Sequence, residues 1–336
     1  MDHPTIDVHA HVVPPASLAR WQAGPRDGIE LLEAPQAPPR LRIDGRVTTG
    51  PILPGLVDID DRLARMDAQG VDIQLLSPFI DTTAYALPAE QAAEHARVFN
   101  DHLAELIAAT PDRFRGLATV PLQDPPAAVA ELTRAMDEHG MVGCEIATTV
   151  DGVELADPRF EPFWEAAADR AALLLLHPHA ALAGRDLTEH FLWNLVGNPA
   201  ESTVALGHLL LSGVLERHPS LRLCAVHGGG FLPYQLGRFD RGYAALPDRV
   251  AKQLTQPPSV WARHLSYDTV THAPAALRWL LDTMGASQVV LGSDHPFIMG
   301  DPDPVATVDA IPGLTAEERT AILGGNAARL LESAGS

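Results

Sequence analysis

Five polar residues of this chain have types and spacing that suit a metal centre. They lie in four segments: Asp7-Val8-His9-Ala10-His11, Leu176-His177-Pro178, Val226-His227-Gly228 and Gly292-Ser293-Asp294. Residues i and i+2 of a strand point to the same face, so His9 and His11 can reach one ion together. That pair alone is equally typical of two hydrogen-bonded histidines in a loop. Three imidazoles and a carboxylate suit Zn²⁺, with Mn²⁺ as a second candidate. We therefore predict one divalent ion held by His9, His11, His177 and Asp294.

The fifth residue, His227, precedes three consecutive glycines, Gly228-Gly229-Gly230. Glycine lets the backbone turn close to a ligand. A histidine at such a turn can be a further ligand, or a general base acting on water at the ion. We favour the base, and we expect His227 and Asp294 to be the catalytic residues. His179 and His295 adjoin the motifs, and we expect them to line the substrate pocket or its rim.

These polar residues have to be positioned by strands, and the chain has eight aliphatic runs that predict strands. The runs are Ile6–Val12, 71–77, 115–120, 141–148, Leu173–His177, 221–227, 265–270 and 288–293. Helical patterns separate them, at Ala89–Ala109, Pro125–His139, 160–171 and 273–284, and Thr315-Ala316-Glu317-Glu318 predicts a capping box before the last helix. Strands alternating with helices predict a (β/α)8 barrel, which places its chemistry at the strand C-termini. We predict a single barrel domain over residues 1–336.

Residues 16–56 interrupt this alternation. The segment is rich in Pro and Gly and contains two short strand-like pieces, 29–32 and 41–43. It falls between the first strand and its helix, so on a barrel it would lie over the C-terminal face. We predict an insertion that covers this face; the alternative is a surface addition without a role at the site.

Bulk composition excludes several classes of function. A net charge of −19 disfavours nucleic acids and anionic membranes, which are bound by basic patches. No run approaches the ~20 apolar residues that span a bilayer, and the sequence starts without a signal-peptide pattern. Cys144 and Cys224 fall inside predicted strands, which indicates reduced core residues and a cytoplasmic location.

Lysine is nearly absent, and this limits the chemistry. Lys252 is the one lysine beside 23 arginines, and the fourth predicted strand reads Val142-Gly143-Cys144-Glu145-Ile146. Two-metal barrel hydrolases commonly bridge their ions with a carboxylated lysine at that strand. One ion is therefore the better prediction, and lysine Schiff-base chemistry is disfavoured.

The motifs together resemble the amidohydrolase superfamily, and within it the decarboxylase branch typified by 2-amino-3-carboxymuconate 6-semialdehyde decarboxylase. The resemblance covers nearly the whole chain and is carried by Ile6-Asp7-Val8-His9-Ala10-His11, residues 66–72, residues 120–124, His177-Pro178, Leu211-Ser212-Gly213, His227-Gly228-Gly229-Gly230, Leu236-Gly237-Arg238 and residues 291–297. It implies the same four ligands and His227 as the residue that assists water at the metal. It also implies that Arg238 reaches a substrate carboxylate in the neighbouring subunit of a homodimer; a surface ion pair is the alternative.

Three positions depart from the branch. A second carboxylate-binding arginine of the family corresponds to Gly50 here, and the phenylalanine beside it becomes Thr49. Arg42 or Arg46 lies near enough in sequence to substitute, and we take Arg46 as the candidate. The tyrosine that usually follows the metal-binding aspartate is His295. These departures affect the substrate, not the metal chemistry.

The resulting hypothesis is a metal-dependent, non-oxidative decarboxylase of a small unsaturated or aromatic carboxylic acid, carboxymuconate-semialdehyde-like or hydroxybenzoate-like. Loss of CO2 leaves electron density on carbon, and a divalent ion can act as the Lewis acid that accommodates it. The alternative is a mononuclear hydrolase of a lactone, an amide or a ring C–N bond. A third possibility is a non-catalytic barrel that serves as a scaffold.

Overall fold

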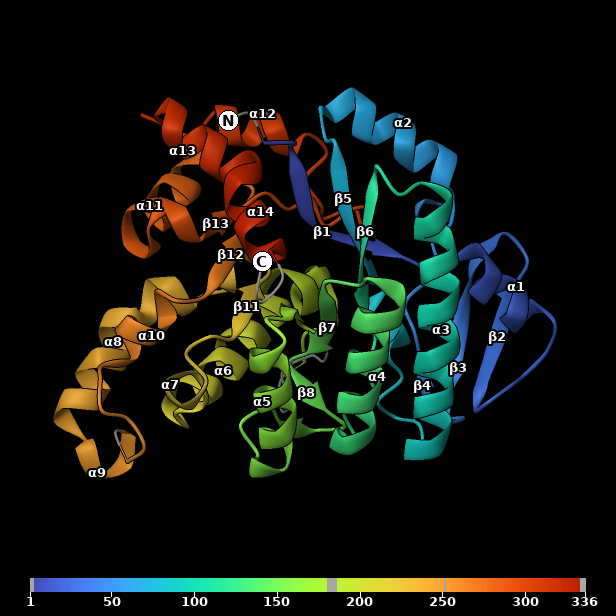
Figure 1. The fold of residues 1–336 in the computed structure, drawn as a ribbon, viewed down its shortest axis with the longest axis horizontal. Coiled ribbons are helices and arrows are strands. Elements are labelled where there is room, and N and C mark those ends of the chain that lie inside the picture. The colour runs from blue at the N-terminus through green and yellow to red at the C-terminus, as the bar shows by residue number, and fades with distance from the viewer. Residues whose placement is uncertain (1–2, 180–185, 251, 333–336) are drawn as a thin grey trace.

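The computed structural model describes residues 3–179, 186–250 and 252–332. Its centre is a sheet of eight parallel strands, around which the helices are arranged (Figure 1). Their order is β1-β5-β6-β7-β10-β11-β12-β13. The bounds are β1 Ile6–Val12, β5 Ile73–Pro78, β6 Phe114–Ala118, β7 Gly143–Ala147, β10 Leu173–His177, β11 Arg222–Ala225, β12 Ser266–Asp268 and β13 Val289–Val290. All eight predicted strands are confirmed.

Backbone contacts between the two outermost strands close the sheet into a barrel. The Val8 amide donates to the Leu291 carbonyl at 2.9 Å, and the Asp294 amide donates to the His9 carbonyl at 2.8 Å. A parallel bridge joins Ala10 to His295. The predicted (β/α)8 architecture is confirmed, and its closure lies directly beside the predicted metal ligands.

Helices cover the outside of the barrel, and the predicted ones are confirmed to within a few residues. The helices after the strands are α2 Ile59–Gln69, α3 Ala89–Ala109, α4 Pro125–His139, α5 Glu161–Asp169, α6 Asn198–Leu211, α7 Val214–Arg217, α8 Leu232–Ala245, α9 Pro247–Val250, α10 Pro258–Ala262, α11 Pro274–Met284, α12 Pro304–Asp309, α13 Ala316–Thr320 and α14 Asn326–Leu331. Short helical turns are η1 Pro54–Leu56, η2 Ile80–Thr83, η3 Pro158–Phe160, η4 Glu189–Phe191, η5 Trp193–Gly197, η6 His227–Gly229, η7 Ala286–Gln288 and η8 Ala321–Gly325. The predicted capping box at Thr315 and Glu318 is present.

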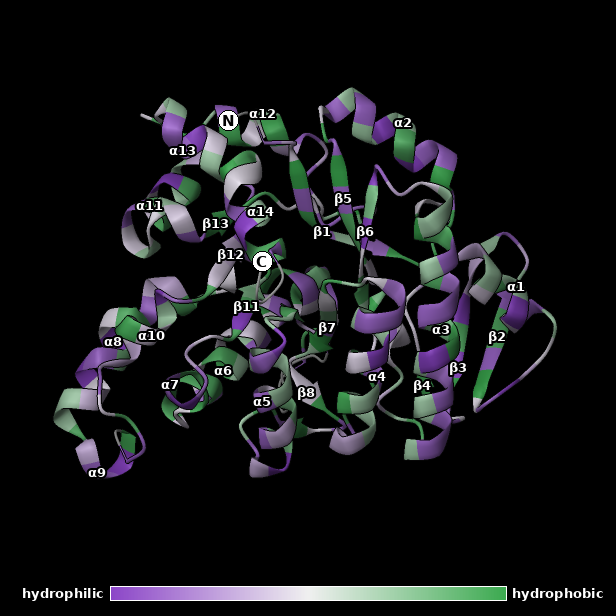
Figure 2. Ribbon diagram, viewed as in Figure 1, coloured by the Kyte–Doolittle hydropathy of each residue, from purple (hydrophilic) through white to green (hydrophobic). Residues whose placement is uncertain are grey.

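Side-chain hydropathy explains this arrangement. The strands are mostly green in Figure 2, whereas the helices alternate between purple and green along their length. Leu173, Leu174, Leu175 and Leu176 of β10 are all fully buried, because one face of the strand meets the barrel interior and the other meets the helices. A helix that covers a barrel needs only one apolar stripe.

The segment between β1 and α2 forms a helix and a small antiparallel sheet. It contains α1 Pro15–Gln22 and the strands β2 Ile29–Ala34, β3 Ala37–Ile43 and β4 Val47–Thr48. In Figure 1 these elements lie beside α3, and Leu41 and Ile43 are buried in the main core. The Gly50 amide reaches the carboxylate of Asp81 in η2, after β5. The segment therefore packs against the main core and the loop after β5. A second hairpin, β8 Thr149–Val150 with β9 Val153–Glu154, follows β7.

Candidate metal centre

The barrel brings His9, His11 and Asp294 into direct contact. The Nε2 atoms of His9 and His11 are 3.1 Å apart, and each lies 3.3 Å from Asp294 Oδ1. Both histidines are fully buried, and Asp294 is 5% exposed. Two ring nitrogens thus converge on one carboxylate oxygen at the C-terminal end of the strands.

His177 and His227 complete the cluster. The ring of His177 lies 4.8 Å from that of His11 and 5.3 Å from those of His9 and His227, centroid to centroid. His227 Nε2 is 3.4 Å from Asp294 Oδ2. His9, His177, His227 and Asp294 each offer a ligand atom within 4.8 Å of the others. The structure thus brings together all five residues singled out from the sequence.

Unpartnered atoms show that these residues fit a cation. His177 Nε2 and Asp294 Oδ1 are buried and have no hydrogen-bond partner among the described residues. Burying a polar group without a partner is costly, and buried charges are normally paired or bound to metal. Both atoms face the centre of the cluster, where one ion would satisfy them.

Hydrogen bonds behind the three histidines fix which nitrogen faces the cluster. His9 Nδ1 lies 2.6 Å from Asp268 Oδ2, His11 Nδ1 lies 3.0 Å from the Pro78 carbonyl, and His177 Nδ1 lies 2.8 Å from the Pro178 carbonyl. Each acceptor requires the proton on Nδ1, so each Nε2 lone pair is free for a metal. Such second partners orient a ligand and raise its basicity.

Asp268 is a site residue that the sequence analysis missed. It ends β12, is fully buried, and accepts hydrogen bonds from the amides of Gly228 and Val270 as well as from His9. Burial, the largest single effect, raises the pKa of its carboxyl, but the hydrogen bond and charge of His9, the charge of His227 and the Gly228 amide together lower the pKa overall. Its place near the end of the seventh predicted strand, 265–270, was the signal available in the sequence, because the other polar residues lie at or near the ends of their strands.

Glu145 is a second missed residue. It lies on β7, where the sequence analysis noted only that lysine is lacking, and it is fully buried. Its Oε1 is 3.6 Å from His11 Nδ1, and neither carboxylate oxygen has a hydrogen-bond partner with good geometry among the described residues. Burial raises the pKa of Glu145 to about 7. Burial opposes a charge on His11, but Glu145 and Asp294 outweigh it and raise the pKa of His11 to about 9.

The backbone at two site residues adopts an uncommon conformation. β11 ends at Ala225 and β13 ends at Val290, earlier than predicted, and beyond them His227 and Asp294 have φ values of 54° and 58°. Adopting this left-handed backbone conformation costs a residue that carries a Cβ about 1–2 kcal/mol of conformational energy. Such strain persists where the surroundings fix it, most often at functional sites.

Gly292 shows how closely the site is packed. A Cβ at this position would meet the Cβ of Asp268 at 2.9 Å and that of His9 at 3.1 Å. Glycine is therefore required where the segment that follows β13 passes behind His9 and its carboxylate partner. Asp7 holds the same closure by accepting hydrogen bonds from Ser293 Oγ at 2.6 Å and from Gln74 at 2.8 Å.

The four predicted substrate-binding residues lie in different surroundings. Arg238 is exposed on α8, and His179 Nε2 lies 3.4 Å from Asp81 Oδ1. Arg46 is bonded at the surface to Asp44 and to the Ala86 carbonyl. Among the described residues, no hydrogen bond or ion pair joins Arg46 to the cluster.

His295 also lies outside the cluster, beside α2. Burial, followed by the charges of Arg62 and Arg65, lowers the pKa of its imidazole to about 3. Arg42, the other replacement considered for the family arginine, pairs with Glu30 on the neighbouring strand. The described ranges contain no hydrogen bond or ion pair that joins the side chains of Arg42, Arg46 or His295 to the metal ligands.

Comparison with known proteins gives the family. Residues 6–332 match the family model described as amidohydrolase. The chain belongs to the amidohydrolase family. It is 31% identical over 329 residues to 2-amino-3-carboxymuconate-6-semialdehyde decarboxylase of Dictyostelium discoideum. The aligned region covers 97% of this chain and 91% of that protein.

Solved structures share the fold of this chain. 5-Carboxyvanillate decarboxylase from Sphingomonas paucimobilis has 25% sequence identity and a TM-score of 0.83, covering 98% of this chain and 99% of that one. Dihydroxybenzoic acid decarboxylase from Polaromonas, solved with bound manganese and an inhibitor, has 23% identity and a TM-score of 0.78, covering 98% and 97%. The predicted family and the predicted decarboxylase class are confirmed.

Proposed function

We propose that this decarboxylase holds one divalent ion with His9, His11, His177 and Asp294 and releases CO2 from an aromatic or unsaturated carboxylic acid. The observation that carries the proposal is the convergence of buried, correctly oriented imidazoles on the unpartnered Asp294 Oδ1. When bound, the ion supplies a Lewis acid that polarises an oxygen of the substrate. Nitrogen-rich donors favour Zn²⁺, and Mn²⁺ also accepts mixed nitrogen and oxygen ligands.

His227 is the proposed proton carrier. In the reaction the bond from carbon to the carboxylate breaks, its electron pair stays on the carbon, and a proton joins that carbon as CO2 leaves. The side chain of His227 is 16% exposed, whereas those of His9 and His11 are fully buried and that of Asp294 is 7% exposed. His227 is thus the member of the cluster that both faces the site and can exchange protons with its surroundings. Burial opposes its charged form, but the hydrogen bond and charge of Asp294 and the charge of Asp268 together outweigh burial and raise its pKa.

A homodimer is part of the proposal. Arg238 is exposed on α8, with Phe231 and Tyr234 exposed at the start of the same segment. Arginine binds a carboxylate with both arms of its guanidinium. We expect Arg238 to reach the substrate carboxylate in the site of a second copy, and His179 to lie at the rim of its own site.

The remaining proposals concern the insertion and the location. Residues 16–56 contact the loop after β5 through Gly50, and Gly55 lies against Pro296 in the loop after β13, which supports a cover over one side of the C-terminal face.

Cys144 and Cys224 are buried free thiols, which supports the proposed cytoplasmic location. In the part of the chain that the structure describes, no helix is both long and apolar enough to cross a membrane.

Release of CO2 tests the proposal. Metal-loaded protein is incubated with hydroxybenzoates and carboxymuconate-type acids, and metal-stripped protein is the control. We expect metal-dependent CO2 release from at least one acid. Hydrolysis of a lactone or an amide without CO2 release from any acid would replace decarboxylation by the hydrolytic alternative.

A further inference from the structure

Four polar side chains next to the metal cluster form one hydrogen-bonded set, called here the buried network: Arg62, Gln74, Asp7 and Ser293. Arg62 donates to Gln74 Oε1 at 2.6 Å. Asp7 Oδ2 accepts from the Gln74 amide group at 2.8 Å and from Ser293 Oγ at 2.6 Å. None of the four is more than 2% exposed. The network joins α2, β5, β1 and the segment that follows β13.

Asp7 connects the backbone at His9 to the backbone before Asp294. Its Oδ1 accepts the His9 amide at 3.1 Å and the Ser293 amide at 3.0 Å. The Asp294 amide in turn donates to the His9 carbonyl at 2.8 Å. One carboxylate therefore binds both segments that must meet if His9 and Asp294 are to hold the same ion.

Ser293 holds the backbone on both sides of Asp294. Its Oγ donates to Asp7 and accepts the His295 amide at 3.1 Å, so one hydroxyl contacts the chain before and after the ligand. Asp294 itself has a φ of 58°, a conformation that persists only where the surroundings fix it. In this conformation its Oδ1 lies 3.3 Å from the Nε2 atoms of both imidazoles on β1.

The other end of the network reaches His11. Arg62 donates to the His11 carbonyl at 2.5 Å and to the Gly55 carbonyl at 3.1 Å. The network therefore bonds to the backbone at or beside three of the four proposed ligands. The fourth, His177, is oriented separately through the Pro178 carbonyl.

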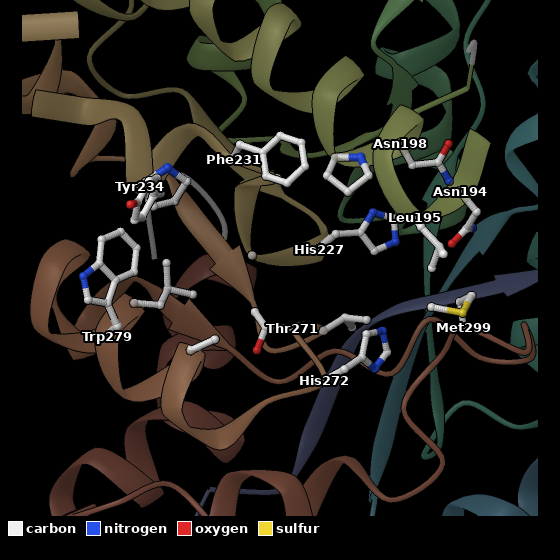
Figure 3. A pocket seen from close by; sticks show the side chains of 17 residues that line it. Asn194, Leu195, Asn198, His227, Phe231, Tyr234, Thr271, His272, Trp279 and Met299 are labelled. Carbon is white, nitrogen blue, oxygen red and sulfur yellow. The ribbon is translucent and has the colours of Figure 1, made fainter. Parts of the chain in front are cut away.

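No residue of the network belongs to the described wall of the cavity beside the cluster. That cavity has a volume of about 390 Å³ between η5, α6, α8 and α11, and His227 is part of its wall (Figure 3). Figure 3 shows His227 at the same end as Met299, away from Tyr234 and Trp279. Substitutions in the network therefore leave the residues of this wall unchanged, and their effect can be read at the ion site.

We propose that Asp7 and Ser293 are positioning residues for the metal centre, which hold Asp294 against His9 through the backbone. The inference rests on the proposed ion site and goes beyond it, because it assigns a role in ion binding to residues that are not ligands. Ligands that are already arranged when the ion binds lose less conformational freedom on binding. Loss of the Ser293 hydroxyl should therefore weaken the affinity for the ion.

Competition titration of the metal-stripped protein with Zn²⁺ against a chromophoric chelator tests this proposal. Ser293→Ala should raise the dissociation constant about 10- to 100-fold, the range seen when residues that support metal ligands are replaced. Ser202→Ala is the matched control, since the Ser202 hydroxyl donates to the Asn198 carbonyl and the residue is 1% exposed, as Ser293 is. The control should bind Zn²⁺ as the parent protein does.

Urea unfolding separates positioning from a general loss of stability. Each protein is unfolded without metal and at one fixed Zn²⁺ concentration, and the two midpoints are compared. An ion that binds the folded state raises stability in proportion to the logarithm of its affinity, so the midpoint should rise less in Ser293→Ala than in the control. If Ser293→Ala lowers both midpoints equally and keeps the parent dissociation constant, the role of Ser293 is only structural and the inference is overturned.

Asp7→Asn gives a second measurement if Ser293→Ala does not fold. Its amide oxygen can keep the two backbone donors, but its NH₂ group then faces the donors of Gln74 and Ser293. Weaker Zn²⁺ binding by this variant supports the inference, and parent-like binding overturns it. Neither readout depends on CO2 release, so weakened binding supports the inference even if no acid is decarboxylated, and parent-like binding by a folded Ser293→Ala variant overturns it even if CO2 is released.

Discussion

Replacing Asp268 by asparagine should weaken metal binding although Asp268 itself touches no ion. Its Oδ2 lies 2.6 Å from His9 Nδ1, while its Oδ1 accepts the amides of Gly228 and Val270 at 2.8 and 3.1 Å. In the Asp268→Asn variant the amide oxygen keeps the two backbone donors, so the NH₂ group faces His9. The asparagine NH₂ and the His9 Nδ1–H are then two donors that face each other. The His9 imidazole therefore moves its proton from Nδ1 to Nε2, the nitrogen that has to bind the metal.

The size of the effect follows from this geometry. The wrong tautomer blocks one of the four ligands but does not remove its ring. The loss of metal affinity should therefore resemble that seen when other residues that hydrogen-bond the second ring nitrogen of a metal-bound histidine are replaced. Such changes cost about 10- to 100-fold in metal affinity, or roughly 1.4–2.8 kcal/mol. Because Asp268 is fully buried, solvent does not substitute for its carboxylate.

The assay is a competition titration of metal-stripped protein with Zn²⁺ or Mn²⁺ against a chromophoric chelator. Asp124→Asn is the matched control, because Asp124 caps α4 by accepting from the Ala127 amide, and asparagine caps equally well. We expect normal affinity in the control and weakened affinity in Asp268→Asn. An unchanged dissociation constant in a folded Asp268→Asn variant would refute the tautomer argument.

Three further perturbations test other parts of the structure. His227→Ala should keep its metal content and lose about 10²–10⁴-fold in kcat; loss of the metal would make His227 a ligand instead. Arg62→Met leaves the Gln74 and His11 oxygens without their buried donor, and should lower the free energy of unfolding in urea by about 1.5–3 kcal/mol; an unchanged midpoint would contradict this. The pKa of Glu161 is lowered to about 2, mainly by its hydrogen bond with Arg217. Its contribution to the free energy of unfolding is therefore present above pH 4.5 and is lost as the pH falls toward 2. Because the Glu161–Arg217 pair is partly exposed, Glu161→Gln should lower the free energy of unfolding in urea by no more than about 1 kcal/mol at pH 7, and should leave it unchanged near pH 2. A difference in stability between the variant and the parent protein that grows as the pH is lowered would contradict this.

The barrel and the cluster were predictable from sequence because both depend on local patterns. Strands buried on both faces are continuous apolar runs, and Leu173–His177 is such a run with a polar residue at its end. Parallel strands share one C-terminal edge, so residues far apart in sequence, such as His9 and Asp294, could be expected to meet.

Side-chain direction and long-range packing were not predictable in the same way. Asp268 and Glu145 each lie in a buried strand, and only the three-dimensional arrangement shows that one meets His9 and the other His11. The sequence placed Arg46 near the site by position, whereas its guanidinium is held by Asp44 at the surface. The early ends of β11 and β13 also depend on the positive φ values of His227 and Asp294, which no residue pattern predicts.

Stepwise reloading of the metal-stripped protein tests the central claim most directly. Increasing amounts of Zn²⁺ or Mn²⁺ are added, and initial CO2 release from a hydroxybenzoate is measured at each loading. The four-ligand site predicts that the rate rises in proportion to added ion and reaches its maximum at one ion per chain. A requirement for two ions, equal CO2 release by the stripped protein, or no release at any loading would contradict it.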